Sequence, residues 1–130
     1  MTEAGGGAWR QASYHPFALT SRYGRGMVLH LPPRSPVHET GAFGDVPVLD
    51  AVAVASDEGG VTLFAVNRDQ ATPVALEVDA RSLPSLSATS HVAISDDDPD
   101  APAGRAAAPV LEHDPAELAT AVPARRCMPF

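Results

Sequence analysis

The sequence predicts an all-β protein, a β-sandwich preceded by a single helix. Segments that alternate apolar and polar side chains recur about every 10–13 residues, with turn residues between them, as in sandwich domains. The 130 residues include thirteen Pro and ten Gly, which favours many turns and short elements. At this length we expect one domain, in which roughly two thirds of the unfolded surface can be buried.

The helix is predicted between the glycine run at residues 5–7 and Gly24. Helical spacing puts aromatic and small side chains on one face: Trp9, Ala12, Tyr14, Phe17 and Ser21. Pro16 must kink or split this helix, since proline cannot donate a backbone hydrogen bond. Gly24 suits a left-handed C-terminal cap, and Arg22 and Arg25 suit the negative end of the helix dipole.

The first half of the body predicts a hairpin flanked by shorter segments. Residues 26–31 alternate and predict a strand, and residues 35–44 predict a loop or short edge strand. Residues 46–55 form the most apolar run, which is typical of a strand covered on both faces. The turn residues at 57–60 join it to a further strand at 61–67.

The second half predicts four short strands separated by polar or proline-containing turns: residues 73–79, 87–95, 110–112 and 117–122. The segment 96–109 is acidic and then rich in Ala and Pro, which indicates a loop. Residues 124–130 are polar and basic, and we expect an irregular tail there.

Composition excludes several classes of function. The formal charge is −7 and all nine basic residues are Arg, so an acidic surface disfavours nucleic acid as a partner. The single cysteine, Cys127, excludes an internal disulfide and a cysteine-based zinc site and fits a reducing compartment. No apolar run approaches ~18 residues, so no membrane span is predicted. The N-terminus lacks the pattern of a signal peptide, and we expect a cytoplasmic protein.

Two segments resemble ion-binding sites but lack residues that such sites need. The acidic run 96–100 lacks the Gly and Glu of a calcium loop at the sixth and twelfth positions, which hold Ala101 and Ala107. A solvated acidic loop is the better interpretation. The glycine run at 5–7 precedes a helix but has no following Lys-Ser/Thr, so a tight loop is favoured over a phosphate site.

No metal or nucleophile pattern emerges from the remaining side chains. The five histidines lie far apart in sequence, with no two at metal-ligand spacing: His15, His30, His38, His91 and His113. There is no nucleophile elbow, and Cys127 lies in the tail. We therefore predict no catalytic residue, no metal ion and no cofactor in this chain.

Several sequence blocks nevertheless resemble one family. They are Met1-Thr2-Glu3 with Ala8-Trp9-Arg10-Gln11, Tyr14-x-Pro16-Phe17, Ser21 to Gly26, Asp45 to Val54, Leu63 to Arg68, and finally His91 with Asp96-Asp97-Asp98. In this order they resemble the C-terminal part of α-L-arabinofuranosidases of glycoside hydrolase family 51. The resemblance extends over residues 1–98.

The resemblance implies a division of the chain. Such enzymes have a (β/α)8 barrel followed by a β-sandwich of jelly-roll type. Residues 1–25 would be the last loop and helix left over from the catalytic barrel, residues 26–123 the sandwich, and residues 124–130 an irregular tail. In the family, the Gln of the Trp-Arg-Gln block approaches the arabinose ring, which makes Gln11 the candidate substrate-binding residue. The alternative is that Gln11 only caps or lines the helix start.

Departures from the family pattern limit what this chain can do alone. The family's acid/base Glu follows Gly-Asn and its nucleophile is a second Glu, both upstream. Here the only Asn is Asn67, followed by Arg68, so neither carboxylate is present. The usual final strand with Ser-Trp-Asn is replaced by residues 124–130.

The resemblance implies an intact enzyme that removes terminal non-reducing α-L-arabinofuranosyl groups from arabinose-containing polysaccharides by double displacement. This fragment would be structural and inactive alone, with its own barrel and an arabinofuranoside as partners of the intact enzyme. A homo-oligomer, commonly a hexamer in the family, is also implied. The alternative is a stand-alone β-sandwich for binding or interaction. That alternative predicts surface aromatics, and after residue 26 the chain has only Phe43, Phe64 and Phe130.

Overall fold

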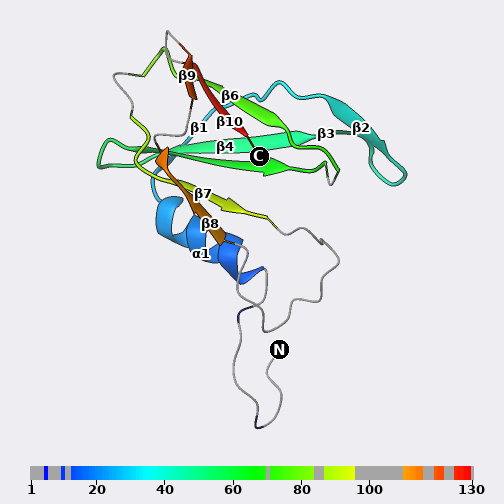
Figure 1. Ribbon diagram of the computed structural model, residues 1–130, viewed down its shortest axis with the longest axis horizontal. Helices are drawn as coiled ribbons and strands as arrows, with labels where there is room; N and C mark the ends of the chain where they lie inside the picture. Colours follow the sequence, from blue (N-terminus) through cyan, green and yellow to red (C-terminus); the bar gives the residue numbers. More distant parts are fainter. Residues whose placement is uncertain are drawn as a thin grey trace.

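The computed structural model describes residues 5, 10, 13–69, 71–83, 87–95, 110–115, 119–121 and 125–129. Helix α1 spans Tyr14–Tyr23 and precedes all of the strands (Figure 1). These are β1 (Met27–Leu29), β2 (Val37–Thr40), β3 (Gly44–Pro47), β4 (Leu49–Ala55), β5 (Val61–Asn67), β6 (Ala75–Asp79), β7 (His91–Ile94), β8 (Val110–His113), β9 (Ala119–Ala121) and β10 (Arg125–Pro129). The predicted all-β body behind one helix is confirmed.

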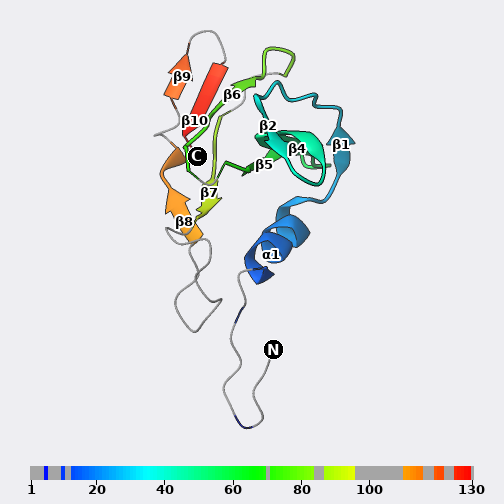
Figure 2. The ribbon, with the colours of Figure 1, turned by 90° about the vertical axis from the view of Figure 1, so that its right-hand side faces the viewer.

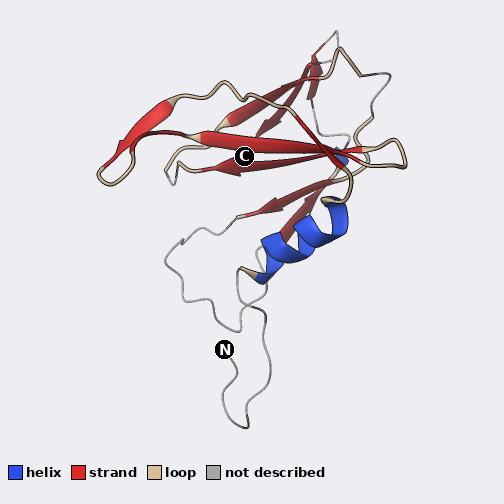
Figure 3. Cartoon of the chain, turned by 180° about the vertical axis from the view of Figure 1, so that it is seen from behind, coloured by secondary structure: helices blue, strands red, loops and turns tan. Residues whose placement is uncertain are grey.

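The strands pair antiparallel in four sheets. Two have three strands, in the orders β1-β4-β5 and β6-β10-β9, and the pairs β2-β3 and β7-β8 stand apart. Figure 2 shows β1 and β4 on one side of the molecule and β6, β9 and β10 on the other. The helix runs below the β1-β4-β5 sheet, as the view from behind also shows (Figure 3).

The β4–β5 hairpin holds most of the core. Its register runs from Leu49↔Asn67 to Ala55↔Val61, and the predicted turn closes it through Ser56 N–H donating to the Gly60 carbonyl at 2.8 Å. The buried apolar side chains of the described residues are Val48, Leu49, Ala53, Val54 and Leu76. Adjacent residues of a strand point to opposite faces, so burial of both Ala53 and Val54 confirms that β4 is covered on both faces at this point.

The predicted strand 46–55 is interrupted at Val48, which corrects the sequence-based boundaries. The Val48 N–H donates to the Pro36 carbonyl at 2.9 Å, and the Leu49 N–H donates to Ser35 Oγ at 2.8 Å. These two donors leave the strand ladder, so the chain before Val48 pairs with a different neighbour. Residues 44–47 become β3 and pair with β2. Strand β2 lies within residues 35–44, which were predicted as a loop or short edge strand.

The tail predicted to be irregular contains β10, and that expectation is wrong for residues 125–129. β10 is the central strand of its sheet, with Arg125↔Asp79 to Pro129↔Ala75 against β6 and further pairs with β9. Backbone groups make these ladders, and the preference for a strand depends on neighbours more than on side-chain pattern. Pro129 is the last residue of β10. Proline has no N–H to donate to a strand ladder, so it disrupts the sheet least at the end of a strand.

Candidate functional site

Helix α1 presents aromatic side chains to solvent. Phe17 is 77% exposed, Tyr14 and Tyr23 are also exposed, and the helix has no buried residue. Tyr14 and Phe17 are three positions apart and therefore lie on one helix face, as the spacing predicts. Leaving one large apolar side chain in water forgoes about 1.5–3 kcal/mol of burial energy. Exposed apolar patches are typical of interaction sites.

The sequence explains why the helix forms without splitting at Pro16. Pro16 is the third residue of α1, where a backbone N–H would have no partner within the helix. The Pro16 carbonyl accepts a hydrogen bond from Thr20 Oγ1 at 2.7 Å. At the other end, Arg25 Nε donates to the Ser21 carbonyl at 3.3 Å, which agrees with the predicted basic residues at the negative helix end.

The helix ends without the predicted left-handed cap. Gly24 has φ −88°, and its N–H donates to the Thr20 carbonyl at 2.8 Å, so the chain leaves α1 without reversing direction. The positive φ lies two residues later, at Gly26, with +138°. A Cβ added to Gly26 would lie 2.0 Å from the Ala55 carbonyl oxygen. Gly26 thus brings the end of α1 against the end of β4.

Arginine side chains accompany the exposed aromatic rings. The Arg10 guanidinium lies 4.9 Å from the centre of the Tyr14 ring, and that of Arg22 lies 5.1 Å from the centre of the Tyr23 ring. Each distance is within the range of a cation–π contact. Aromatic and basic side chains therefore lie together at both ends of α1, on a chain that is acidic overall.

Strand β1 also carries exposed apolar side chains. Met27 is 68% and Val28 66% exposed, and β1 is an edge strand that pairs with β4 in the described part of the chain. The unpaired edge offers backbone groups, and its side chains offer apolar area, to a neighbour. We call the exposed apolar residues Tyr14, Phe17, Tyr23, Met27 and Val28, which lie on more than one face of α1 and β1, the α1–β1 surface.

The charged contacts of the body have local, structural roles. Arg68 reaches Asp50 at 2.8 Å, and Arg81 forms a bidentate pair with Asp79 that raises the pKa of its guanidinium. Asp69 Oδ1 accepts hydrogen bonds from the Ala71 and Thr72 N–H groups, which lowers the pKa of that carboxyl. Asp69 is half-buried and the charged groups of the two ion pairs are exposed. All of them lie in turns or near strand ends, so they order the turns that hold them.

The candidate residue Gln11 lies outside the described residues, as do the acidic run 96–100 and two glycines of the run at 5–7. Gly5 has φ +78°, a conformation suited to a tight loop. Within the described ranges no three or more His, Cys, Asp or Glu side chains gather as a metal site. Nor does any helix there have the length and apolarity to cross a membrane.

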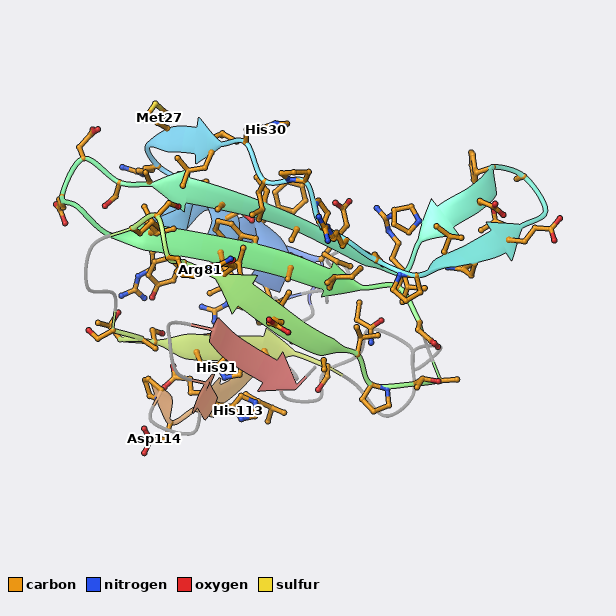
Figure 4. The ribbon with its side chains drawn as sticks, turned by 90° about the horizontal axis from the view of Figure 1, so that it is seen from above. Met27, His30, Arg81, His91, His113 and Asp114 are labelled. Carbon is orange, nitrogen blue, oxygen red and sulfur yellow. The ribbon has the colours of Figure 1, made fainter. Side chains whose placement is uncertain are left out.

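The structure brings together two histidines that sequence spacing keeps apart. His91 of β7 and His113 of β8 are direct partners, and their rings stack with centroids 4.7 Å apart (Figure 4). Spacing along one element could not reveal this pair, because the contact forms across two strands. The contact could have been found only by pairing the predicted strands 87–95 and 110–112 as an antiparallel hairpin.

The fold is a β-rich domain of antiparallel strands behind one short helix, and it carries exposed apolar side chains on α1 and β1. Residues 1–118 match the family model of the alpha-L-arabinofuranosidase C-terminal domain. The chain belongs to this family, the C-terminal domain of glycoside hydrolase family 51 arabinofuranosidases, as its sequence blocks had indicated.

Two curated relatives and one solved structure show the extent of the likeness. An intracellular exo-alpha-(1->5)-L-arabinofuranosidase of Streptomyces lividans is 44% identical over 101 residues, which cover 78% of this chain and 15% of that protein. A protein of the same description from Bifidobacterium longum is 46% identical over 88 residues, 66% of this chain and 15% of that protein. A solved family 51 alpha-L-arabinofuranosidase from Bifidobacterium longum superposes with TM-score 0.75 at 32% identity, over 98% of this chain and 25% of that chain.

Proposed function

We propose that this chain is the C-terminal part of a retaining α-L-arabinofuranosidase. The parent enzyme hydrolyses terminal non-reducing α-L-arabinofuranosides of arabinose-containing polysaccharides by double displacement. This proposal is supported by the names of the relatives and by the short share of their length that the chain spans. The relatives are named intracellular, which supports a cytoplasmic location here.

The role of this chain is to brace the catalytic domain. The observation that supports this role is the exposed α1–β1 surface, in which Phe17 is 77% exposed. Residues 1–25 complete the barrel in this proposal, and residues from 26 onward form the sandwich. Gly26 is a fitting junction, since its close approach to Ala55 fixes where the helix leaves the sheet. Assembly into a homo-oligomer, such as a hexamer, is part of the same proposal.

Gln11 supplies a contact to the sugar once the barrel is present. It directly follows Arg10, whose guanidinium lies over the Tyr14 ring at the start of α1. Docking of the aromatic face would therefore bring the preceding segment to the catalytic domain. The chain alone lacks both catalytic Glu motifs and is inactive.

Release of 4-nitrophenol from its α-L-arabinofuranoside tests this proposal. The chain alone should show no turnover, and turnover should appear when it is mixed with a catalytic portion of the Streptomyces lividans relative that lacks the matching segment. Gln11→Ala should weaken the rescued activity more than Ala12→Ser beside it. Turnover by the chain alone, or no gain from mixing despite binding, would overturn the proposed role.

The exposed side chain of Phe43 favours the second candidate function, a stand-alone binding module. It is 84% exposed at the turn between β2 and β3, and its N–H donates to Thr40 Oγ1 at 3.1 Å. One exposed aromatic ring offers a stacking surface to a sugar or a protein. Retention of the chain on immobilised arabinan or arabinoxylan, lost in Phe43→Ala, would favour this role over bracing.

A further inference from the structure

We propose that His91 and His113 form a two-histidine site for a divalent transition metal ion of the class that prefers imidazole, such as Cu²⁺, Ni²⁺ or Zn²⁺. The site is independent of arabinofuranoside hydrolysis. It follows from the geometry of the β7–β8 pair, in which the two residues are direct partners across the strands. Neutral imidazole is the commonest metal ligand among side chains.

The two rings are close enough to share one ion. The ring planes differ by 27° and the centroids are 4.7 Å apart. Two ligating nitrogens at 2.0–2.1 Å from a tetrahedral ion are about 3.4 Å apart. An imidazole nitrogen binds a metal ion in the plane of its ring, so both rings must turn from the stacked arrangement until their planes meet at the ion. Rotation about the outer side-chain bond of histidine is soft, which allows this turn.

Burial favours the pair as ligands over His30 and His38. His91 and His113 are half-buried, whereas His30 and His38 are exposed. His15 is also half-buried but lies on helix α1. Partial burial holds the rings near one orientation, so less freedom is lost when an ion binds. No third metal-binding side chain joins them within the described ranges, and water fills the remaining positions of the ion.

The position of the pair gives the ion a structural effect. β7 and β8 form a sheet of two strands, an arrangement that is marginal by itself. Ile94↔Val110 is the pair nearest to the connection between the strands, and His91↔His113 is the pair at the opposite, open end (Figure 4). A metal bridge there closes a long loop and prevents the open end from separating, as other cross-links between distant residues do.

Titration of the untagged chain with CuSO₄ or ZnSO₄ tests the site. Isothermal calorimetry should show one ion per chain, and His91→Gln and His113→Gln should each weaken binding by about tenfold or more. Cu²⁺ bound to the parent chain should show electron paramagnetic resonance couplings to two nitrogens. Binding should weaken as pH falls, because protonated imidazole cannot ligate a metal.

His30→Gln is the matched control, since His30 is exposed and outside the pair. Zn²⁺ should raise the unfolding temperature of the parent chain and of His30→Gln, and EDTA should reverse the rise. The same Zn²⁺ concentration should leave His91→Gln unchanged. Equal losses in His30→Gln, undiminished binding in both pair variants, or couplings to a single nitrogen would overturn the site. Should His91→Gln not fold, His113→Gln and the resonance spectrum decide.

Discussion

Gly26 is the residue whose identity the backbone geometry constrains most tightly. Its φ of +138° is rarely adopted by residues with a side chain, and an added Cβ would lie 2.0 Å from the Ala55 carbonyl oxygen. Both effects act at the point where α1 passes into β1. Either the chain shifts away from β4 or the substituted residue is strained.

Gly26→Ala should therefore destabilise the fold by at least about 2 kcal/mol, because a left-handed penalty adds to a clash with backbone. Gly41→Ala is the control, since nothing lies within 4 Å of its added Cβ and its φ is not in the positive range. That control should be neutral or slightly stabilising. Urea unfolding curves measure both variants, and equal midpoints would refute the constraint.

Asp69 predicts a pH dependence of stability. Its folded pKa is lowered from the ordinary value of 3.8 by the N–H groups of Ala71 and Thr72, so the charged form is the one that the fold favours. The contribution is fully present above the unfolded pKa and is lost as pH falls through that value to the lower folded one. Between about pH 5 and 7 it should be constant.

Asp69→Asn keeps a side-chain acceptor and removes the charge. Parent and variant should differ in unfolding midpoint above about pH 5, and the difference should shrink as the pH is lowered toward 3. Asp57→Asn, in the exposed β4–β5 turn, is the comparison. A difference that stays constant across this range would show that the carboxylate charge has no part in holding the turn.

At the scale of elements, α1 carries side chains that are expected to matter for docking but not for folding of the isolated chain. Phe17 lies on the exposed face, so its ring contributes little to the isolated chain. Phe17→Asp should change the free energy of unfolding by no more than about 0.5 kcal/mol relative to the parent, as surface substitutions usually do. It should abolish the gain of activity on mixing with a separately expressed catalytic portion.

Phe43→Asp is the control for that experiment. Phe43 is also highly exposed but lies on the β2–β3 hairpin, away from α1 (Figure 1). It should leave rescue by the catalytic portion intact, as measured by the same arabinofuranoside assay. Equal loss in both variants would mean that general exposure of charge, rather than the α1–β1 surface, governs association.

Elements with strong side-chain patterns were predictable from the sequence. The aromatic face of α1 followed from helical spacing, and β4 and β5 followed from alternation around a glycine-containing turn. The break at Val48 was not predictable in this way, because it depends on the Pro36 carbonyl and Ser35 Oγ accepting two backbone donors. Stacking of His91 on His113 likewise depends on strand register.

For the whole molecule, the small core explains why a large partner is expected. No described side chain is completely buried, and four of the five buried apolar residues lie within residues 48–54. A core concentrated in one short segment supplies little burial energy for a chain of 130 residues. Covering the α1–β1 surface adds apolar burial where the isolated chain has none.

The β6-β10-β9 sheet provides the test at this scale, because its central strand comes from the end of the chain. Removing residues 122–130 would leave β6 and β9 with unpaired edges toward one another. Amide exchange of β6 should then accelerate, and the shortened chain should associate in size-exclusion chromatography. Arg125→Ser combined with Arg126→Ser retains the backbone and should preserve exchange protection of β6, because ladder hydrogen bonds do not require these side chains. Unchanged protection of β6 in the shortened chain would instead mean that the sheet does not depend on β10.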